Sequence, residues 1–284
     1  MVEKTWSLSR LRNELLQVLR SEATERERAN KVVGGWGSLP TDAPDAAELV
    51  MALMDLAKLD GARGALRALD GDSGGWKQLE KSGLWKALEL RVLTLLWERD
   101  TRAARRPRSN ARDLAIATLH LLAFERREAV WCAGQLRASL DGGAFGVTRT
   151  YALSTFALWL AETAEEGALV APESLGQSVY AGIFESWGSD AGLSDAIERM
   201  CAYHMRRTID RSDAELWVEF EFPPYPLFPV EYLALSVARR RCDMPTPKPS
   251  NPLLVTPLAE PPVEANAGES LGWDWLDGVL QAMC

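Results

Sequence analysis

Residues 215–241, ELWVEFEFPPYPLFPVEYLALSVARRR, join an acidic, aromatic run to a helix through four closely spaced prolines. Proline lacks a backbone N–H and fixes φ, so residues 223–228 are not expected to be helical. Proline is favoured in the first turn of a helix, and we therefore expect a helix to begin at Pro229. Glu231 near its positive end and the three arginines at its negative end favour the same assignment.

Helical patterns dominate the rest of the chain. Apolar residues recur at intervals of three and four, the spacing of one helix face. The predicted helical segments are residues 5–31, 46–69, 76–98, 113–140, 148–165, 173–187, 193–210, 229–241 and, at the end of the chain, 269–283. The polar residues 21–31 are expected to project or to fray, and a turn is expected near Asp60–Gly61. The sequence therefore predicts an all-α fold of roughly ten helices.

The order of these helices predicts stacked helical hairpins, in a bundle or a solenoid-like array. Residues 48–69 and 113–140 share a pattern of long apolar helix, charged turn and shorter helix. Residues 76–98 are apolar almost all round, which is typical of a helix in the middle of a bundle. We expect one helical domain over residues 1–244. The proline-rich residues 245–284, with their short terminal helix, are expected to wrap and pack on the same domain.

Composition indicates a soluble, cytoplasmic protein. Hydrophobic residues make up 47% of the chain and charged residues 25%, as in ordinary globular proteins. No apolar run reaches about 18 residues, so we expect no membrane span and no membrane partner. The first residues lack the apolar core of a secretory signal. The four cysteines are far apart and form no CxxC pair, so we expect free thiols in a reducing compartment.

Charge is distributed unevenly along the chain. The net charge is −8, yet residues 99–150 carry 10 Lys and Arg against 5 Asp and Glu, a balance of +5. Residues 151–235 carry 4 against 14, a balance of −10. An acidic segment argues against direct binding of nucleic acid, since phosphate contacts dominate that affinity. It favours a basic protein partner, although solubility alone explains the same charge equally well.

Residues that carry chemistry are scarce. His120 and His204 lie in strongly apolar helices and are predicted to be core residues. His204 shares a helix face with Cys201, but no further Cys or His pair completes a metal site. No phosphate-binding loop, dinucleotide-binding loop or nucleophile elbow occurs. We therefore predict no catalytic, cofactor-binding or metal-binding residues, no cofactor, and a protein that is not an enzyme.

Candidate contact residues lie in two acidic stretches that contain tryptophan. In an extended run Glu219 and Glu221 would point the same way, as anchors for a basic partner, as a glycosidase-like pair, or as a plain exposed edge. Tryptophans near turns and acidic residues suit a partner surface better than those on helix stripes. The predicted partner-binding residues are Glu215, Trp217, Glu219, Glu221, Trp273, Asp274 and Trp275.

The runs YPLFPVEYLALSVARRR (225–241) and NPLLVTPLAEPP (251–262) resemble the C-terminal part of the immunity protein 49 family. The shared features are a proline-bounded entry, a Leu/Ala-rich helix ending in arginines, and a proline-rich tail. The resemblance implies a helical cytoplasmic protein encoded beside a polymorphic or type VI secretion toxin. Such a protein binds its cognate toxin domain and blocks the active site or the access of substrate. We expect that domain to be basic, for example a nuclease, and the acidic segment to be its docking surface.

Two other functions stay open from the residues alone. A helical-repeat scaffold or regulator would share the fold and would bind an internal protein partner in a groove between helix pairs. An enzyme would require His120 or His204.

Overall fold

The computed structural model describes residues 6–35, 43–99, 111–141, 151–167, 175–208 and 219–262, and within these ranges it contains helices and no strand. The α-helices are α1 (Leu8–Val18), α2 (Glu22–Gly35), α3 (Ala43–Leu69), α4 (Gly74–Arg99), α5 (Ala111–Ala123), α6 (Glu128–Asp141), α7 (Tyr151–Glu166), α8 (Ala181–Glu185), α9 (Asp190–Arg207) and α10 (Val230–Arg241). Single 3-10 turns follow α1 (Leu19–Ser21) and close the described chain (Pro257–Ala259). The prediction of an all-α fold with roughly ten helices is confirmed.

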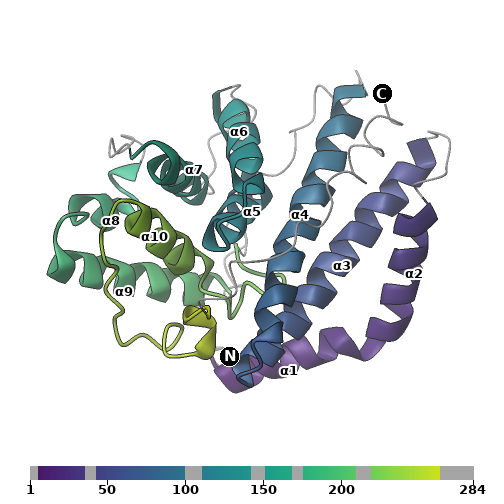
Figure 1. Ribbon diagram of the computed structural model, residues 1–284, viewed down its shortest axis with the longest axis horizontal. Coiled ribbons are helices and arrows are strands. Elements are labelled where there is room, and N and C mark those ends of the chain that lie inside the picture. The colour runs from purple at the N-terminus through teal and green to yellow at the C-terminus, as the bar shows by residue number, and fades with distance from the viewer. Residues whose placement is uncertain are drawn as a thin grey trace, which may run out of the picture.

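The helices stack as antiparallel pairs across the molecule (Figure 1). α3 and α4 form one hairpin through the turn at residues 70–73, and α5 and α6 form a second through residues 124–127. α2 covers the outer side of α3, while α7 to α10 gather beyond α5. None of the described helices is both long and apolar enough to cross a membrane.

α3 runs unbroken through the predicted turn at Asp60–Gly61, so that prediction is wrong. Asp60 is 3% exposed, and its carboxylate accepts hydrogen bonds from Arg26 and Trp85. Gly61 lies against Pro224, where an added Cβ would come within 2.7 Å of the proline ring. Tertiary contacts therefore hold both residues inside a helix, although their local propensity favours a turn.

α2 packs on α3 instead of projecting, which corrects the prediction for residues 21–31. Glu22 and Ala29 are buried against the neighbouring helix. The sequence of α2 shows no apolar stripe, because the buried face of this helix consists of the small Ala29 and of Glu22, whose charge is paired. Burial of a charge is tolerated when an opposite charge and hydrogen bonds accompany it.

Residues 173–187 contain far less helix than predicted. The structure describes this segment from Leu175 onward, as turns followed by the single short helix α8. The Ser178 hydroxyl donates to the Leu175 carbonyl and accepts from the Tyr180 backbone N–H. Such local side-chain bonds offer the backbone an alternative to helical hydrogen bonds.

One large apolar core connects α1 with α3 to α10 and with the end of the described chain. α10 lies inside it, with nearly every side chain from Val230 to Arg239 buried. Residues 245–262 are irregular and lie against the helices, with Leu253, Leu254 and Leu258 in the core. The helix predicted at residues 269–283 lies outside the described residues.

Candidate functional site

Both histidines of the chain hold the same residue, Tyr225, in the proline-rich segment. The Tyr225 hydroxyl lies 3.0 Å from His120 Nδ1, and the Tyr225 carbonyl oxygen lies 2.8 Å from His204 Nε2. His120 Nε2 lies 2.9 Å from the Leu79 carbonyl oxygen. Because a carbonyl only accepts, the proton of His120 resides on Nε2, and Nδ1 accepts from the tyrosine hydroxyl. The prolines and the two histidines together fix the course of residues 223–229.

The surroundings of each histidine suit a structural role. Both side chains are 0% exposed, as predicted for core residues. Burial lowers the pKa of His120 to about 4, so this imidazole is neutral at pH 7. His204 Nδ1 lies 2.5 Å from Glu231 Oε2, and the Tyr180 hydroxyl donates to the other oxygen of that carboxylate. All four ring nitrogens are therefore engaged inside the core.

The cysteine beside His204 is part of the same core. Cys201 is 2% exposed, and burial raises the pKa of its thiol. A thiol in this environment stays protonated and is a poor nucleophile. Cys132, Cys201 and Cys242 are all free, as expected.

Glu219 is buried, which corrects its prediction as an exposed anchor. Its side chain is 4% exposed, whereas Glu221 is exposed, so the two carboxylates do not share one surface. Residues 219–220 form a turn rather than an extended run, because the Phe220 ring stacks on His204 with the centroids 3.9 Å apart. The Tyr203 hydroxyl donates to Glu219 Oε1 at 3.0 Å. Burial raises the pKa of Glu219 to about 7.

The other predicted contact residues, Glu215, Trp217, Trp273, Asp274 and Trp275, lie outside the described residues. Within the described part of residues 151–235 the acidic groups are spread over several environments. Glu219 and Glu231 lie in the core, while Asp195 on α9 and Glu165 and Glu166 at the end of α7 are exposed. The described acidic residues of this segment therefore do not all belong to the surface.

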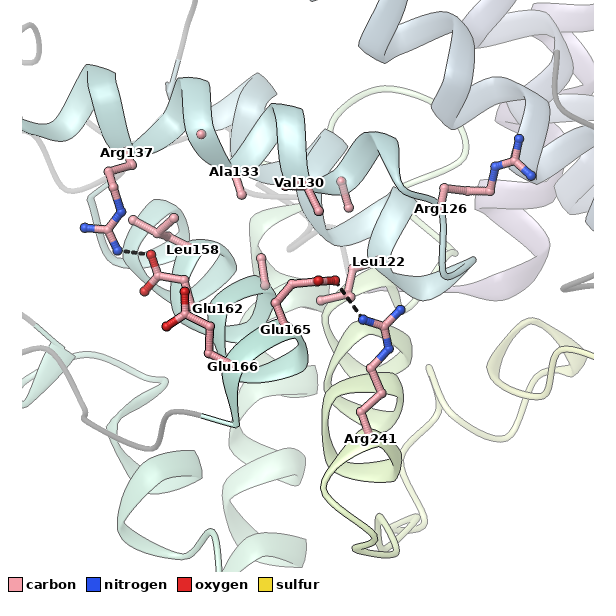
Figure 2. Close-up of a pocket in the computed structure, with 13 residues that line it drawn as sticks. Leu122, Arg126, Val130, Ala133, Arg137, Leu158, Glu162, Glu165, Glu166 and Arg241 are labelled. Carbon is pink, nitrogen blue, oxygen red and sulfur yellow. Dashed lines mark hydrogen bonds and ion pairs between the residues drawn. The ribbon is translucent and has the colours of Figure 1, made fainter. Parts of the chain in front are cut away.

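A groove between α6 and α7 is the candidate site for a partner (Figure 2). Its volume is about 280 Å³. The floor consists of small and aliphatic side chains, namely those of Leu122, Ala129, Ala133, Leu158 and Ala161, and the exposed Gly134 also lines the groove. Val130 stands at the edge with 53% of its surface exposed. An apolar floor with an exposed aliphatic edge suits an apolar side chain of another protein.

Charged pairs lie at opposite ends of this groove in Figure 2. Arg137 of α6 pairs with Glu162 of α7 at one end. At the other end Arg241 Nη1 lies 2.9 Å from Glu165 Oε1 and 3.3 Å from the Ala164 carbonyl oxygen. These pairs are exposed, so each contributes little stability.

The last turn of α7 carries an unfavourable charge. The helix ends at Gly167, which has φ +68° and donates its N–H to the Thr163 carbonyl. Glu165 and Glu166 therefore lie beside the negative end of the helix dipole, and no basic residue of α7 lies in this turn. A cation from outside the helix relieves this repulsion, as Arg241 does for Glu165. This groove could not be predicted from the sequence, because the small residues of α6 lie along a helix whose pattern is typical of an ordinary core helix.

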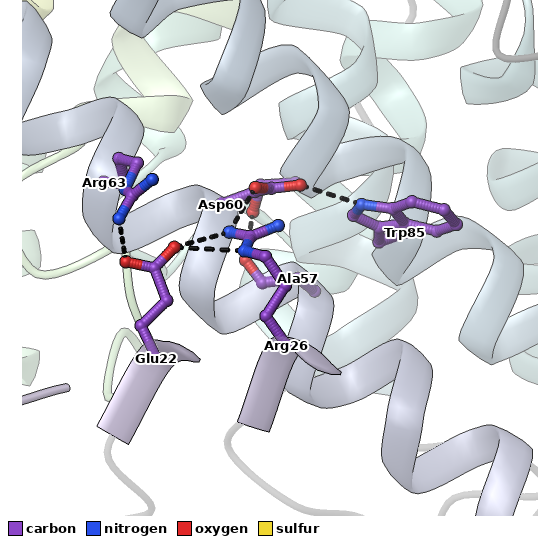
Figure 3. Close-up of polar contacts among 7 residues, drawn as sticks. Glu22, Arg26, Ala57, Asp60, Arg63 and Trp85 are labelled. Carbon is purple, nitrogen blue, oxygen red and sulfur yellow. Dashed lines mark hydrogen bonds and ion pairs between the residues drawn. The ribbon is translucent and has the colours of Figure 1, made fainter. Parts of the chain in front are cut away.

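A second group of charges stabilises the packing of α2 on α3 (Figure 3). Arg26 donates to Glu22 Oε1 at 2.9 Å and to Asp60 Oδ1 at 2.8 Å, and Arg63 donates to the other oxygen of Glu22. The Trp85 indole N–H donates to Asp60 Oδ2 at 2.9 Å. Burial alone would lower the pKa of Arg26, but the two carboxylates outweigh it and raise that pKa. These groups satisfy one another inside the structure.

Comparison of the chain with protein-family models, with curated proteins and with solved structures gives no match. The resemblance of residues 225–241 and 251–262 to the immunity protein 49 family therefore stays a prediction.

Proposed function

We propose that this chain is a protein-binding module that neutralises a cognate antibacterial toxin in the cytoplasm, and that the α6–α7 groove docks the toxin. The observation that carries this proposal is the groove itself, which joins an apolar floor to the acidic end of α7. The resemblance described above supplies the class of partner. The toxin domain is expected to be basic, and the complex blocks its active site or the access of its substrate.

The geometry suggests how such a partner would bind. An apolar side chain of the toxin occupies the floor beside Val130, where burial of aliphatic surface contributes about 25 cal/mol per Å². A lysine or arginine beside it approaches Glu166, where the carboxylate and the helix end attract a cation together. The pairs formed by Arg137 and Arg241 are exposed enough to rearrange as the partner arrives.

The helical-repeat scaffold is the second candidate function. The stacked hairpins α3–α4 and α5–α6, and a groove beside the second of them, are the features that this hypothesis expects. It differs in its partner, which would be a protein of the same cell with no toxic activity. The identity of the partner therefore separates the two functions, while both use the same groove.

Expression of the protein encoded by the neighbouring reading frame tests the proposal. The expected result is growth arrest of cells that express the neighbour alone, rescue by this chain, and a 1:1 complex on gel filtration. A complex with a harmless neighbour, or with an unrelated protein of the same cell, would favour the scaffold. Absence of both rescue and complex would remove the toxin hypothesis.

The acidic end of α7 is tested by charge reversal. In Glu166→Lys the association rate is expected to fall by about tenfold or more at low salt, and the difference from the unmodified chain is expected to shrink at high salt. Glu185→Lys on α8 is the matched control, because Glu185 is also exposed and does not line the groove. Stopped-flow kinetics measure the association rates of the two variants. An equal fall of the association rate in both would show that the net charge of the chain matters and that the end of α7 does not.

A further inference from the structure

The walls of the α6–α7 groove are two helix faces of equal length. The lining residues of α6 begin at Ala129 and end at Arg137, and those of α7 begin at Leu158 and end at Glu166. On both helices they follow one another at alternating steps of one and three positions, which is the spacing of one helix face. Each wall therefore spans about 12 Å, a little more than two turns.

The size of the groove sets how much of a partner it holds. Its volume is about 280 Å³. A cavity of about 150 Å³ holds one benzene molecule, so the groove has room for two apolar side chains of the size of leucine or phenylalanine. A second apolar side chain therefore fits beside the one that the proposed docking requires.

The walls offer no backbone partners to an extended segment. The described lining comes from α5, α6, α7 and α10 and from the turn after α5, and interior backbone groups of a helix bond to one another. At the end of α7, the Thr163 carbonyl accepts from Gly167 N–H and the Ala164 carbonyl accepts from Arg241. An extended segment would bury N–H and C=O groups without partners here, whereas a helix bonds its own. The groove therefore favours a helix as its occupant.

Gly134 lets such a helix come close to α6. It is exposed, and an added Cβ would meet nothing within 4 Å. Ala129, Ala133 and Ala161 on the floor also have short side chains. The axes of packed helices lie about 8 to 10 Å apart, depending on the side chains at the contact, and small residues permit the shorter distances.

One carboxylate of the lining is left for a cation of the partner. Each arginine that lines the groove pairs with a carboxylate other than Glu166. Glu166 itself is exposed and forms no ion pair within the described residues. It lies five positions beyond Ala161 of the floor, which is about 7.5 Å along α7. The charge of the groove is therefore complementary to a segment that carries a lysine or arginine beyond its apolar residues.

We propose that the occupant of the groove is an amphipathic α-helix of the partner, with two apolar side chains one turn apart and a lysine or arginine one or two turns beyond them. This inference rests on the proposed function and specifies the element that the toxin domain places in the groove. The two apolar side chains lie on the floor beside Val130, and the cation pairs with Glu166. The backbone of the partner helix crosses α6 at Gly134.

Gly134→Ala tests the inference in the complex of the full chain with the product of the neighbouring reading frame. The added methyl group lies where the partner helix crosses, so the Kd from calorimetry is expected to rise about tenfold or more. The free chain has open space at this position and is expected to fold normally. Gly34→Ala on α2 is the matched control, because Gly34 is also an exposed helical glycine with nothing within 4 Å and does not line the groove. Its Kd is expected to stay unchanged.

Hydrogen–deuterium exchange locates the contact on the partner. On addition of the full chain, protection is expected in one segment of the neighbouring product. We expect this segment to carry apolar residues at positions i and i+4 and a lysine or arginine one or two turns further along. Protection confined to a segment without this spacing would overturn the inference.

A comparison with Val130→Glu separates failure of this inference from failure of the proposed function. If Val130→Glu weakens the complex and Gly134→Ala does not, the partner docks in the groove through a loop or a single side chain, and the helix is wrong. If neither change weakens the complex, the partner binds elsewhere, and the groove is wrong as well. If no complex forms with the neighbouring product, the toxin hypothesis and this inference fall together.

Discussion

At the scale of single residues, the position of an ionisable side chain decides whether it stabilises the fold or can contact a partner. His120 and His204 could be predicted as core residues, because they lie within apolar helical stripes. The burial of Glu219 could not be predicted, since it depends on the stacking of Phe220 on His204, which brings a separate helix against the turn. An alternating run of aromatic and acidic residues is equally typical of an exposed strand and of a turn that packs against helices.

Glu219 is expected to make stability fall as pH rises. Its pKa is raised from 4.5 to about 7 in the folded state, so between these values the folded chain holds a proton that the unfolded chain has lost. The free energy of unfolding therefore decreases from pH 5 to pH 7 and levels off above, by an upper figure of about 3 kcal/mol for this group. Urea unfolding of the unmodified chain and of Glu219→Gln over this range measures the effect.

The glutamine variant keeps the acceptor for Tyr203 and has no proton to lose. We expect the two chains to differ little at pH 5 and the variant to be the more stable one at pH 8. Contributions from the other titrating groups are common to both chains and cancel in the difference. A difference that does not change with pH would contradict the raised pKa of Glu219.

At the scale of the elements, close packing and buried ion pairs hold the helices together where apolar periodicity is weak. α4, α7, α9 and α10 could be predicted within a few residues, because α4 is apolar almost all round, α7 and α9 carry an apolar stripe, and α10 follows a proline. α2 and the unbroken α3 could not be placed correctly, since Arg26 lies far along the chain from the Asp60 it binds. Local sequence carries no sign of such a pair.

Arg26→Leu tests the ionic contact between α2 and α3. This change leaves Asp60 and Glu22 as carboxylates that are 3% and 6% exposed without their shared cation, and we expect a loss of about 3–5 kcal/mol in the free energy of unfolding. Arg28→Leu is the matched control on the same helix, because Arg28 pairs with Asp55 while 67% exposed. Its loss is expected to be about 1 kcal/mol or less. Equal losses in urea unfolding would contradict a structural role for the buried pair.

Gly64 sets the close crossing of α3 and α4. An added Cβ at this position would lie 2.7 Å from the Leu79 backbone nitrogen and 2.8 Å from the Gly75 carbonyl oxygen. Backbone atoms on two helices cannot yield cheaply, so Gly64→Ala is expected to destabilise the fold by about 1–3 kcal/mol. Gly134→Ala on α6 meets nothing within 4 Å and is expected to stabilise by about 0.5–1 kcal/mol through helix propensity. Thermal and urea unfolding measure the change in stability of the two variants, which is expected to have opposite signs.

At the scale of the whole molecule, the described part of the acidic segment 151–235 does not lie entirely on the surface. Glu219 and Glu231 lie in the core, and the exposed acidic residues on the described helices of this segment belong to α7, α8 and α9. The fold class could be predicted because helical periodicity is local. The docking surface could not, because a groove arises only when α6 and α7 come together. The proposal of partner binding accordingly rests on the α6–α7 groove and on the charge at the end of α7.

The affinity of the chain for the product of the neighbouring reading frame, measured by calorimetry with two matched valine variants, tests this proposal most directly. Val130→Glu places a charge at the edge of the groove, and Val255→Glu places one at a valine that is 66% exposed elsewhere. Both positions are exposed enough to accept glutamate with little effect on stability. We expect Val130→Glu to raise Kd by about tenfold or more, which is a loss of about 1.4 kcal/mol in binding free energy, and Val255→Glu to leave Kd unchanged. An unchanged Kd in Val130→Glu, or an equal rise in both variants, would contradict docking in the groove.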